Sequence, residues 1–288
     1  MTALPGRLLS CDGVDLYVEC HGSGPPLLML HGFAGSVAAM RELATELARD
    51  STVYVVDLPG HGRSEAPRDV RCYRMERCIS QLLALFDTLG LQRVGVLGYS
   101  MGARVALSLC AAHPERVCSA LLLGVSPGIL NPDDRRARVA ADDQWVRRLR
   151  EDGLEAFMDD WIDRPLFAGF KRLDQQRQSE QRALRLAQRP HGLMLSLQGM
   201  GTGVMPPLHT SLAEIDCPVA LVVGELDVKF RTIARELLKY LPRASLSLVS
   251  GAGHAAHVEN TDEFVAIARR FFARAGAPGR LDFGYGDP

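Results

Sequence analysis

The sequence predicts an α/β protein with a mostly parallel central sheet, helices on both sheet faces and a helical cap insertion. Short apolar runs bounded by Gly, Pro and Asp recur along the chain, which is typical of fully buried parallel strands. Segments with helical periodicity separate these runs, and this alternation favours an open sheet covered on both sides. A length of 288 residues, with 47% hydrophobic and 23% charged residues, suits a globular domain with a large core.

The individual elements follow from the same patterns. We expect an N-terminal antiparallel hairpin, because segments 7–10 and 14–19 flank Asp12-Gly13, a favourable hairpin turn. The expected buried strands are residues 27–30, 52–56, 94–97, 120–123, 219–223 and 246–249. The expected helices are residues 37–48, 73–89, 101–112, 232–241 and 263–274. These elements form a single domain of residues 1–275, and the Gly- and Pro-rich residues 276–288 are expected to be a flexible tail.

A cap insertion is expected at about residues 127–210. No convincing strand lies there, whereas residues 142–154 and 173–186 have amphipathic helical spacing. The stretch is not a linker, because it contains four aromatic side chains that need burial: Trp145, Phe157, Trp161 and Phe167. An insertion above the carboxyl ends of the strands would cap a pocket.

Composition excludes several classes of partner and site. The formal net charge of −1 gives no basic field for nucleic acid or for an anionic membrane. The seven cysteines are scattered and lack a C-x-x-C pair, which argues against a disulfide framework and against a zinc site. No signal-peptide pattern and no run of 18 apolar residues is present, so we expect a cytoplasmic protein without a membrane segment. The sequence leaves the oligomeric state open.

Ser100 is the expected catalytic serine. It lies in Gly98-Tyr99-Ser100-Met101-Gly102, between an apolar strand and a helix rich in Ala and Leu. A Gly-x-Ser-x-Gly at a strand-to-helix junction is typical of a nucleophile elbow, in which a tight turn presents the serine hydroxyl to a cleft.

Asp227 and His254 are the expected partners of this serine. A serine needs an imidazole to take its proton and an acid to orient that imidazole. Both residues follow later strands, in the chain order Ser, Asp, His that this topology requires. Glu225 is the alternative acid and His257 the alternative base, but Asp227 suits the loop better and His257 lies in the next helix. No two histidines have the spacing of a metal-binding H-E-x-x-H.

Two backbone N–H groups are expected to form an oxyanion hole. The N–H of Met101 follows the serine at a helix N-terminus, where donors are free. The second donor would come from His31-Gly32-Phe33, with the N–H of Phe33 as the best candidate. Such a pair stabilises either a tetrahedral oxyanion or an enolate, and the sequence does not distinguish them.

Several motifs together resemble the α/β-hydrolase superfamily over nearly the whole chain. They are His31-Gly32-Phe33, Asp57-Leu58-Pro59-Gly60-His61-Gly62-Arg63-Ser64, the elbow, and Gly251-Ala252-Gly253-His254. The more variable segments resemble 2-succinyl-6-hydroxy-2,4-cyclohexadiene-1-carboxylate synthase of menaquinone biosynthesis. These segments are residues 126–131, Gln144-Trp145-Val146, Trp161 with residues 165–168, and residues 224–230. The resemblance implies a lyase that uses no cofactor and removes pyruvate from an anionic small-molecule substrate by proton abstraction and elimination.

A substrate with several carboxylates calls for buried arginines. Arg104 lies one helical turn after Ser100 on the same face, so it faces either the pocket or the core, where it would form a structural ion pair. The resemblance implies that Arg138, Arg185, Trp161 and Tyr99 complete the substrate site. Neighbouring arginines compete for the two cap positions: Arg135 and Arg136 with Arg138, and Arg182 and Arg189 with Arg185.

Two alternatives to the lyase remain at this stage. The first is a serine hydrolase that acts on esters or C–C bonds of acidic small molecules, with Ser100 as a true nucleophile. The second is a small-molecule receptor of the same fold with a slow or idle triad, since fold does not determine function.

Overall fold

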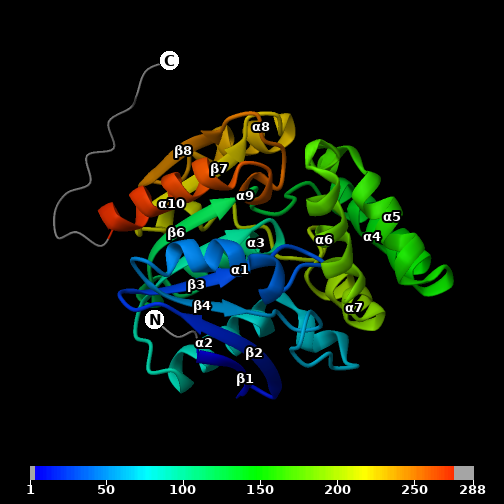
Figure 1. Ribbon diagram of the computed structural model, residues 1–288, viewed down its shortest axis with the longest axis horizontal. Helices are drawn as coiled ribbons and strands as arrows, with labels where there is room; N and C mark the ends of the chain where they lie inside the picture. Colours follow the sequence, from blue (N-terminus) through cyan, green and yellow to red (C-terminus); the bar gives the residue numbers. More distant parts are fainter. Residues whose placement is uncertain (1–3, 276–288) are drawn as a thin grey trace.

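An eight-stranded sheet forms the centre of the protein, seen in a computed structural model that describes residues 4–275 (Figure 1). The strand order is β1-β2-β4-β3-β5-β6-β7-β8. The strands are β1 (Leu4–Cys11), β2 (Val14–His21), β3 (Pro26–Leu30), β4 (Thr52–Val56), β5 (Val94–Tyr99), β6 (Val117–Leu123), β7 (Val219–Gly224) and β8 (Ala244–Val249). β2 pairs antiparallel with β1 and β4, and all other pairs are parallel. The expected tail at residues 276–288 lies outside the described residues.

The predicted hairpin joins β1 and β2. Asp12 and Gly13 form its turn with φ values of 49° and 80°, and two positive φ angles are what a two-residue hairpin turn of the favoured twist requires.

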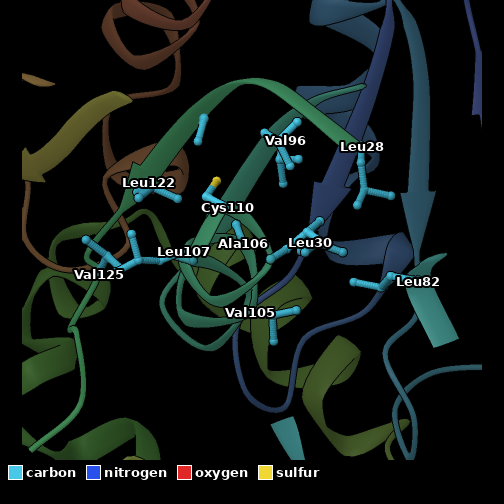
Figure 2. Packing of buried hydrophobic residues seen from close by; sticks show 14 of the residues in the cluster. Leu28, Leu30, Leu82, Val96, Val105, Ala106, Leu107, Cys110, Leu122 and Val125 are labelled. Atoms are coloured by element: carbon cyan, nitrogen blue, oxygen red, sulfur yellow. The ribbon is translucent and has the colours of Figure 1, made fainter. Parts of the chain in front are cut away.

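Successive side chains of a strand point to opposite faces of the sheet, so the core consists of two clusters, one on each face. Leu28 and Leu30 of β3 belong to one buried cluster, and Leu27 and Met29 belong to the other. The first cluster packs against α2 (Met75–Thr88), α3 (Met101–Ala112) and α8 (Val228–Leu237). The second packs against α1 (Val37–Leu47) and α10 (Thr261–Ala275). Figure 2 shows part of the first cluster, in which side chains of β3, β5 and β6 meet α3.

The prediction that every parallel strand is fully buried is wrong for β8. Only Val249 of this strand is buried, and Leu248 is 38% exposed. β8 is the last strand in the sheet order and pairs only with β7, so its outer edge and part of its surface face solvent.

Helix α8 begins at Val228, four residues before the expected start at residue 232. Its N-cap is Asp227, whose side chain accepts a hydrogen bond from the N–H of Phe230. The remaining short helices are α9 (Ala256–Glu259) and the 3-10 turns Val70–Tyr73, Pro114–Arg116 and Leu212–Glu214.

The cap consists of helices on one side of the sheet, at the right in Figure 1. They are α4 (Pro132–Glu151), α5 (Gly153–Asp163), a 3-10 helix (Pro165–Arg172), α6 (Gln175–Leu186) and α7 (Pro190–Met200). The expected single helix over residues 142–154 is wrong, because α4 ends at Glu151 and α5 begins at Gly153, whose φ of 82° breaks the helix. α4 begins ten residues earlier, since the Asn131 side chain accepts from two N–H groups of its first turn and Pro132 starts the helix.

The cap has an apolar cluster of its own. Phe157 and Trp161 stack with ring centroids 5.5 Å apart, and Trp145 meets both rings edge-on. Phe33, from the loop after β3, enters this cluster with its ring centroid 4.9 Å from that of Trp161. No helix within residues 4–275 is both long and apolar enough to cross a membrane.

A matched pair of leucines tests the core. Leu82 of α2 is fully buried, whereas Leu8 of β1 is 55% exposed. Leu82→Ala should lower the free energy of unfolding by about 2–5 kcal/mol, because a cavity remains between α2 and the sheet. Leu8→Ala should change it by less than about 0.5 kcal/mol. Urea unfolding measures both, and equal losses would contradict the assignment of the core.

Candidate active site

Ser100 lies in a strained turn between β5 and α3. Its φ and ψ are 51° and −101°, a conformation that non-glycine residues rarely adopt. The turn is tight because a Cβ at Gly98 would lie 2.4 Å from the carbonyl oxygen of Gly102. A Cβ at Gly102 would lie 2.3 Å from the carbonyl oxygen of Leu30. Both glycines of the motif are therefore required by close backbone packing.

The structure brings Ser100, His254 and Asp227 into one hydrogen-bonded chain. The hydroxyl of Ser100 lies 3.0 Å from Nε2 of His254, and Nδ1 of His254 lies 2.7 Å from Oδ2 of Asp227. A carboxylate can only accept, so Nδ1–H donates to Asp227 and leaves Nε2 to accept from the serine. This is the arrangement in which an imidazole can take a serine proton.

Aromatic rings surround the imidazole. The ring centroid of His254 lies 4.5 Å from that of Phe230, 5.5 Å from Tyr99 and 6.0 Å from Phe167. His254 is 1% exposed and Asp227 8% exposed, so the pair is shielded from bulk water. Glu225, the alternative acid, instead accepts a hydrogen bond from the N–H of Gly251.

The two expected oxyanion donors lie on adjoining segments. The N–H of Gly102 donates to the carbonyl of His31 at 3.1 Å, which joins the first turn of α3 to the loop that carries Phe33. Within the described residues, neither the N–H of Phe33 nor that of Met101 donates to a protein acceptor. Phe33 and Met101 both line the same pocket as Ser100.

His31 fixes the shape of this loop. Its Nδ1–H donates to the carbonyl of Gly32, and its Nε2 accepts from the N–H of Leu58 at 3.0 Å. An imidazole can accept only when it is neutral, and burial lowers the pKa of His31. The buried neutral histidine thus holds the loop before Phe33 against the end of β4.

Five cationic side chains line the pocket above Ser100. They are Arg104 of α3, Arg138 of α4, Arg164 after α5, Arg185 of α6 and Lys229 of α8. No Asp or Glu within the described residues lines it. The pocket also receives the rings of Phe33, Tyr99, Trp161, Phe167, Phe170 and Phe230. A local excess of positive charge on an apolar surface suits a small organic anion.

Arg104 has no ion pair with any described carboxylate. Its guanidinium donates to the carbonyl of Met200 at 2.5 Å and contacts Sδ of Met205. Burial, and then the charge of Arg138, lower the pKa of Arg104 to about 10, so it stays charged at neutral pH. The alternative of a structural ion pair therefore does not describe this residue.

Asp142, which does not itself line the pocket, balances part of this charge. Both of its carboxylate oxygens accept from Nε of Arg138, at 2.9 and 3.0 Å. Burial raises the pKa of Asp142 although Arg138 beside it acts the other way. Arg164 lies on the faces of Trp161 and Trp145, 4.4 and 5.4 Å from the ring centroids.

Arg185 reaches the pocket from another direction. Its guanidinium lies 4.6 Å from the ring centroid of Phe170 and donates to the carbonyl and side-chain oxygens of Gln181. Burial lowers the pKa of Arg185, and no described carboxylate pairs with it. The pocket therefore carries positive charge on more than one wall.

Comparison with known proteins identifies the family. An α/β-hydrolase-fold family model matches residues 25–261. A putative 2-succinyl-6-hydroxy-2,4-cyclohexadiene-1-carboxylate synthase of Bacillus subtilis is 38% identical over 262 residues, which cover 90% of this chain and 95% of that protein. The chain belongs to the α/β-hydrolase superfamily and, within it, to this synthase family.

Other members agree with this placement. The synthase of Escherichia coli O1:K1 is 32% identical, with 84% of this chain and 91% of that protein covered. A solved structure of MenH from S. aureus has a TM-score of 0.87 and 30% identity, and covers 90% of this chain and 99% of that one. An enol-lactonase from Burkholderia xenovorans, with a TM-score of 0.81 and 21% identity, shares the fold.

The structure distinguishes the competing cap arginines of this family member. Arg138 and Arg185 line the pocket, as do Trp161, Tyr99 and Arg104. The competing arginines bind elsewhere: Arg135 to the carbonyl of Gly203, Arg136 to Asp133, Arg182 to Asp159 and Glu155, and Arg189 to the carbonyl of Ser64.

Sequence reasoning missed Arg164 and Lys229. Arg164 directly precedes the resembling segment 165–168 and Lys229 lies within the resembling segment 224–230, but no spacing rule connects either residue to Ser100. Lys229 lines the pocket, and partial burial and the charges of Arg138 and Arg164 lower its pKa. Within residues 4–275 no cluster of three or more His, Cys, Asp or Glu could hold a metal ion.

His257, the alternative base, is a packing residue that makes stability depend on pH. Its ring lies 4.4 Å from that of Tyr99, and burial followed by the charges of Arg185 and His254 lowers its pKa from 6.5 to about 3. Between these values the unfolded chain binds a proton that the folded chain does not. The free energy of unfolding therefore falls as the pH drops from about 6.5 towards about 3.

His257→Phe should flatten this dependence by up to about 1.4 kcal/mol per pH unit, because it removes one such proton. Urea unfolding of both proteins between pH 4 and 6 measures the slopes. Measurements at pH 8 are the internal control, because the change in slope should vanish there. Equal slopes at low pH would mean that His257 titrates alike in the folded and unfolded chains.

Proposed function

We propose that this protein eliminates pyruvate from 5-enolpyruvoyl-6-hydroxy-2-succinyl-cyclohexene carboxylate, giving 2-succinyl-6-hydroxy-2,4-cyclohexadiene-1-carboxylate for menaquinone biosynthesis. The observation that carries the proposal is the position of the Ser100–His254–Asp227 chain beneath five cations in a pocket without a lining carboxylate. The family relatives bear the name of this synthase.

The triad supplies the base. Ser100, made basic by His254, takes the proton α to the succinyl carbonyl, and its own hydroxyl proton moves to Nε2. The C–H electron pair becomes an enolate, whose oxygen accepts hydrogen bonds from the N–H groups of Phe33 and Met101. Asp227 stabilises the imidazolium through its 2.7 Å hydrogen bond.

Collapse of the enolate completes the reaction. Its electrons form the ring diene and expel the enolpyruvoyl oxygen with the electron pair of the C–O bond. The leaving enolate gains a proton at carbon to become pyruvate, and return of the Nε2 proton of His254 to the serine balances the proton that Ser100 gives up. The arginines hold the substrate carboxylates through charge-assisted hydrogen bonds, so that the acidic C–H faces Ser100. Arg104, Arg138 and Arg185 fill this role with Arg164 and Lys229, while Trp161 and Tyr99 shape the apolar wall.

A cytoplasmic location is part of the proposal. All seven cysteines lie in the described part of the chain as free thiols. Cys11, Cys78, Cys110 and Cys217 are buried, which suits a compartment that keeps thiols reduced.

The serine hydrolase remains the second candidate, because the 3.0 Å contact between Ser100 and His254 would also activate a nucleophile. Turnover of the synthetic pathway substrate, followed by coupled detection of pyruvate, tests the two against each other. A neutral p-nitrophenyl ester is the control substrate. We expect rapid pyruvate release with poor ester cleavage. Ester cleavage without pyruvate release would favour the hydrolase. No turnover of either substrate would favour a receptor.

Ser100→Ala should lower the rate of pyruvate release by at least about 1,000-fold, because the base is lost. Substrate affinity, measured by calorimetry, should remain close to that of the native protein, because the arginines and the oxyanion donors are unchanged. A variant with near-native turnover would remove Ser100 from the mechanism.

Arg104→Ala should lower kcat/KM for the pathway substrate by about 10- to 100-fold, the value of a hydrogen bond to a charged group. Cleavage of the neutral ester should change little. The matched control is Arg182→Ala, since Arg182 pairs with Glu155 and Asp159 outside the pocket. An equal loss on both substrates would identify Arg104 as a structural residue.

A further inference from the structure

Glu259, the last residue of α9, has a buried carboxylate that the proposed reaction does not use. Its side chain is 4% exposed. Oε2 accepts from the N–H of Gly253 at 2.6 Å, and Oε1 accepts from the N–H of Ala255 at 3.1 Å. These two N–H groups belong to the residues immediately before and after His254. One carboxylate therefore fixes the backbone on both sides of the catalytic histidine.

The same carboxylate is held from the cap. Arg172, at the end of the 3-10 helix, donates to Oε2 of Glu259 at 3.1 Å. The backbone of that helix lies directly on the carboxylate, because a Cβ at Gly169 would come within 1.9 Å of Oε2. A side chain at position 169 would displace the carboxylate from its contacts, so the position of the 3-10 helix and the position of the Glu259 carboxylate are linked.

This 3-10 helix is also a wall of the pocket. Leu166, Phe167 and Phe170 line it, and the ring of Phe167 meets that of His254. A second contact lies next to the first, where Arg177 of α6 donates to the carbonyl of Val258 at 3.2 Å. The cap is thus attached to the core beside His254.

We propose that Glu259 is a positioning residue for His254 and that its ion pair with Arg172 couples the cap to the catalytic imidazole. Loss of either backbone contact would let the loop around His254 shift, and Nε2 would leave the 3.0 Å contact with Ser100. This inference deepens the proposed function and takes from it only that Ser100 depends on His254 for its basicity.

Glu263 provides a matched control. It is also a glutamate that binds the loop before His254, since it accepts from the N–H and the hydroxyl of Ser250 at 2.9 and 3.0 Å. These contacts lie four residues before His254 and not beside it. If substitution only weakened the loop in general, variants of both glutamates would lose activity alike. If Glu259 positions His254, only the variant of Glu259 should lose activity.

The test uses a p-nitrophenyl alkylphosphonate that modifies Ser100. The serine oxygen forms a bond to phosphorus, p-nitrophenolate leaves, and the serine proton passes to His254. The rate reports the Ser100–His254 pair without the pathway substrate, so it remains informative even if the protein releases no pyruvate. Steady-state kcat and KM for pyruvate release are measured alongside it.

Glu259→Gln keeps the shape of the side chain but places an amide NH2 where one oxygen accepts. It should slow phosphonate modification and lower kcat by about 10- to 100-fold, because a displacement of the imidazole by about 1 Å has an effect of this size. KM should stay within about twofold of the native value. Glu263→Gln should leave all three values within about twofold. Arg172→Ala keeps both backbone contacts and should slow modification about two- to fivefold, as for a partly exposed ion pair.

An unchanged modification rate in Glu259→Gln, or an equal loss in Glu263→Gln, would overturn the proposal. If Glu259→Gln does not fold, the modification rate of Arg172→Ala tests the proposal instead. Arg172 is half exposed, and its loss leaves the loop contacts of Glu259 in place. An unchanged rate in that variant would overturn the coupling between the cap and His254.

Discussion

The first turn of α3 packs backbone against backbone on the end of β3, and the proposed site is assembled around this contact. Gly102 allows the approach and donates its N–H to the carbonyl of His31. The contact fixes Ser100 and the N–H of Met101 relative to the loop that carries Phe33. The left-handed φ of Ser100 costs about 1–3 kcal/mol, and the buried helix and strands on either side hold the residue in that conformation. A small rotation of α3 would move Ser100 and the N–H of Met101 relative to the N–H of Phe33, which lies on the other segment.

Charge imposes the second constraint on the site. Arg104 is buried against a backbone carbonyl, and Arg164 lies on two indole rings, so neither forms a direct ion pair with a described carboxylate. Asp142 is the carboxylate that acts on Arg138, Arg104 and Arg164 together. Burial of unpaired charge opposes folding, and residues placed this way are typical of sites built for an anionic ligand. The apolar rings between the cations keep water away from the reacting atoms and strengthen each electrostatic contact.

Much of the fold could be predicted because the chemistry of strands and turns is local. The continuous apolar run of β3 and the Asp12-Gly13 turn predict their elements, and the order Ser100, Asp227, His254 follows from the positions of strand ends. Arg104 could be predicted because its place depends on one helical turn. Arg164 and Lys229 could not, because their places depend on how the cap docks on the core. Glu259 likewise acts through backbone contacts that no residue spacing reveals. The exposure of β8 depends on the strand order across the whole sheet.

The five pocket cations stand on both sides of the seam between cap and core: Arg104 and Lys229 on core helices, and Arg138, Arg164 and Arg185 on the cap. Like charges across this seam repel, and among the described carboxylates Asp142 and Asp227 offset part of that repulsion. A ligand with several carboxylates would bridge the two halves and cancel that repulsion. The bound substrate then acts as a counter-ion that stabilises the folded chain. The free energy of unfolding therefore rises with the substrate concentration. In a cell, the abundance of this protein would follow the supply of the molecule that it consumes.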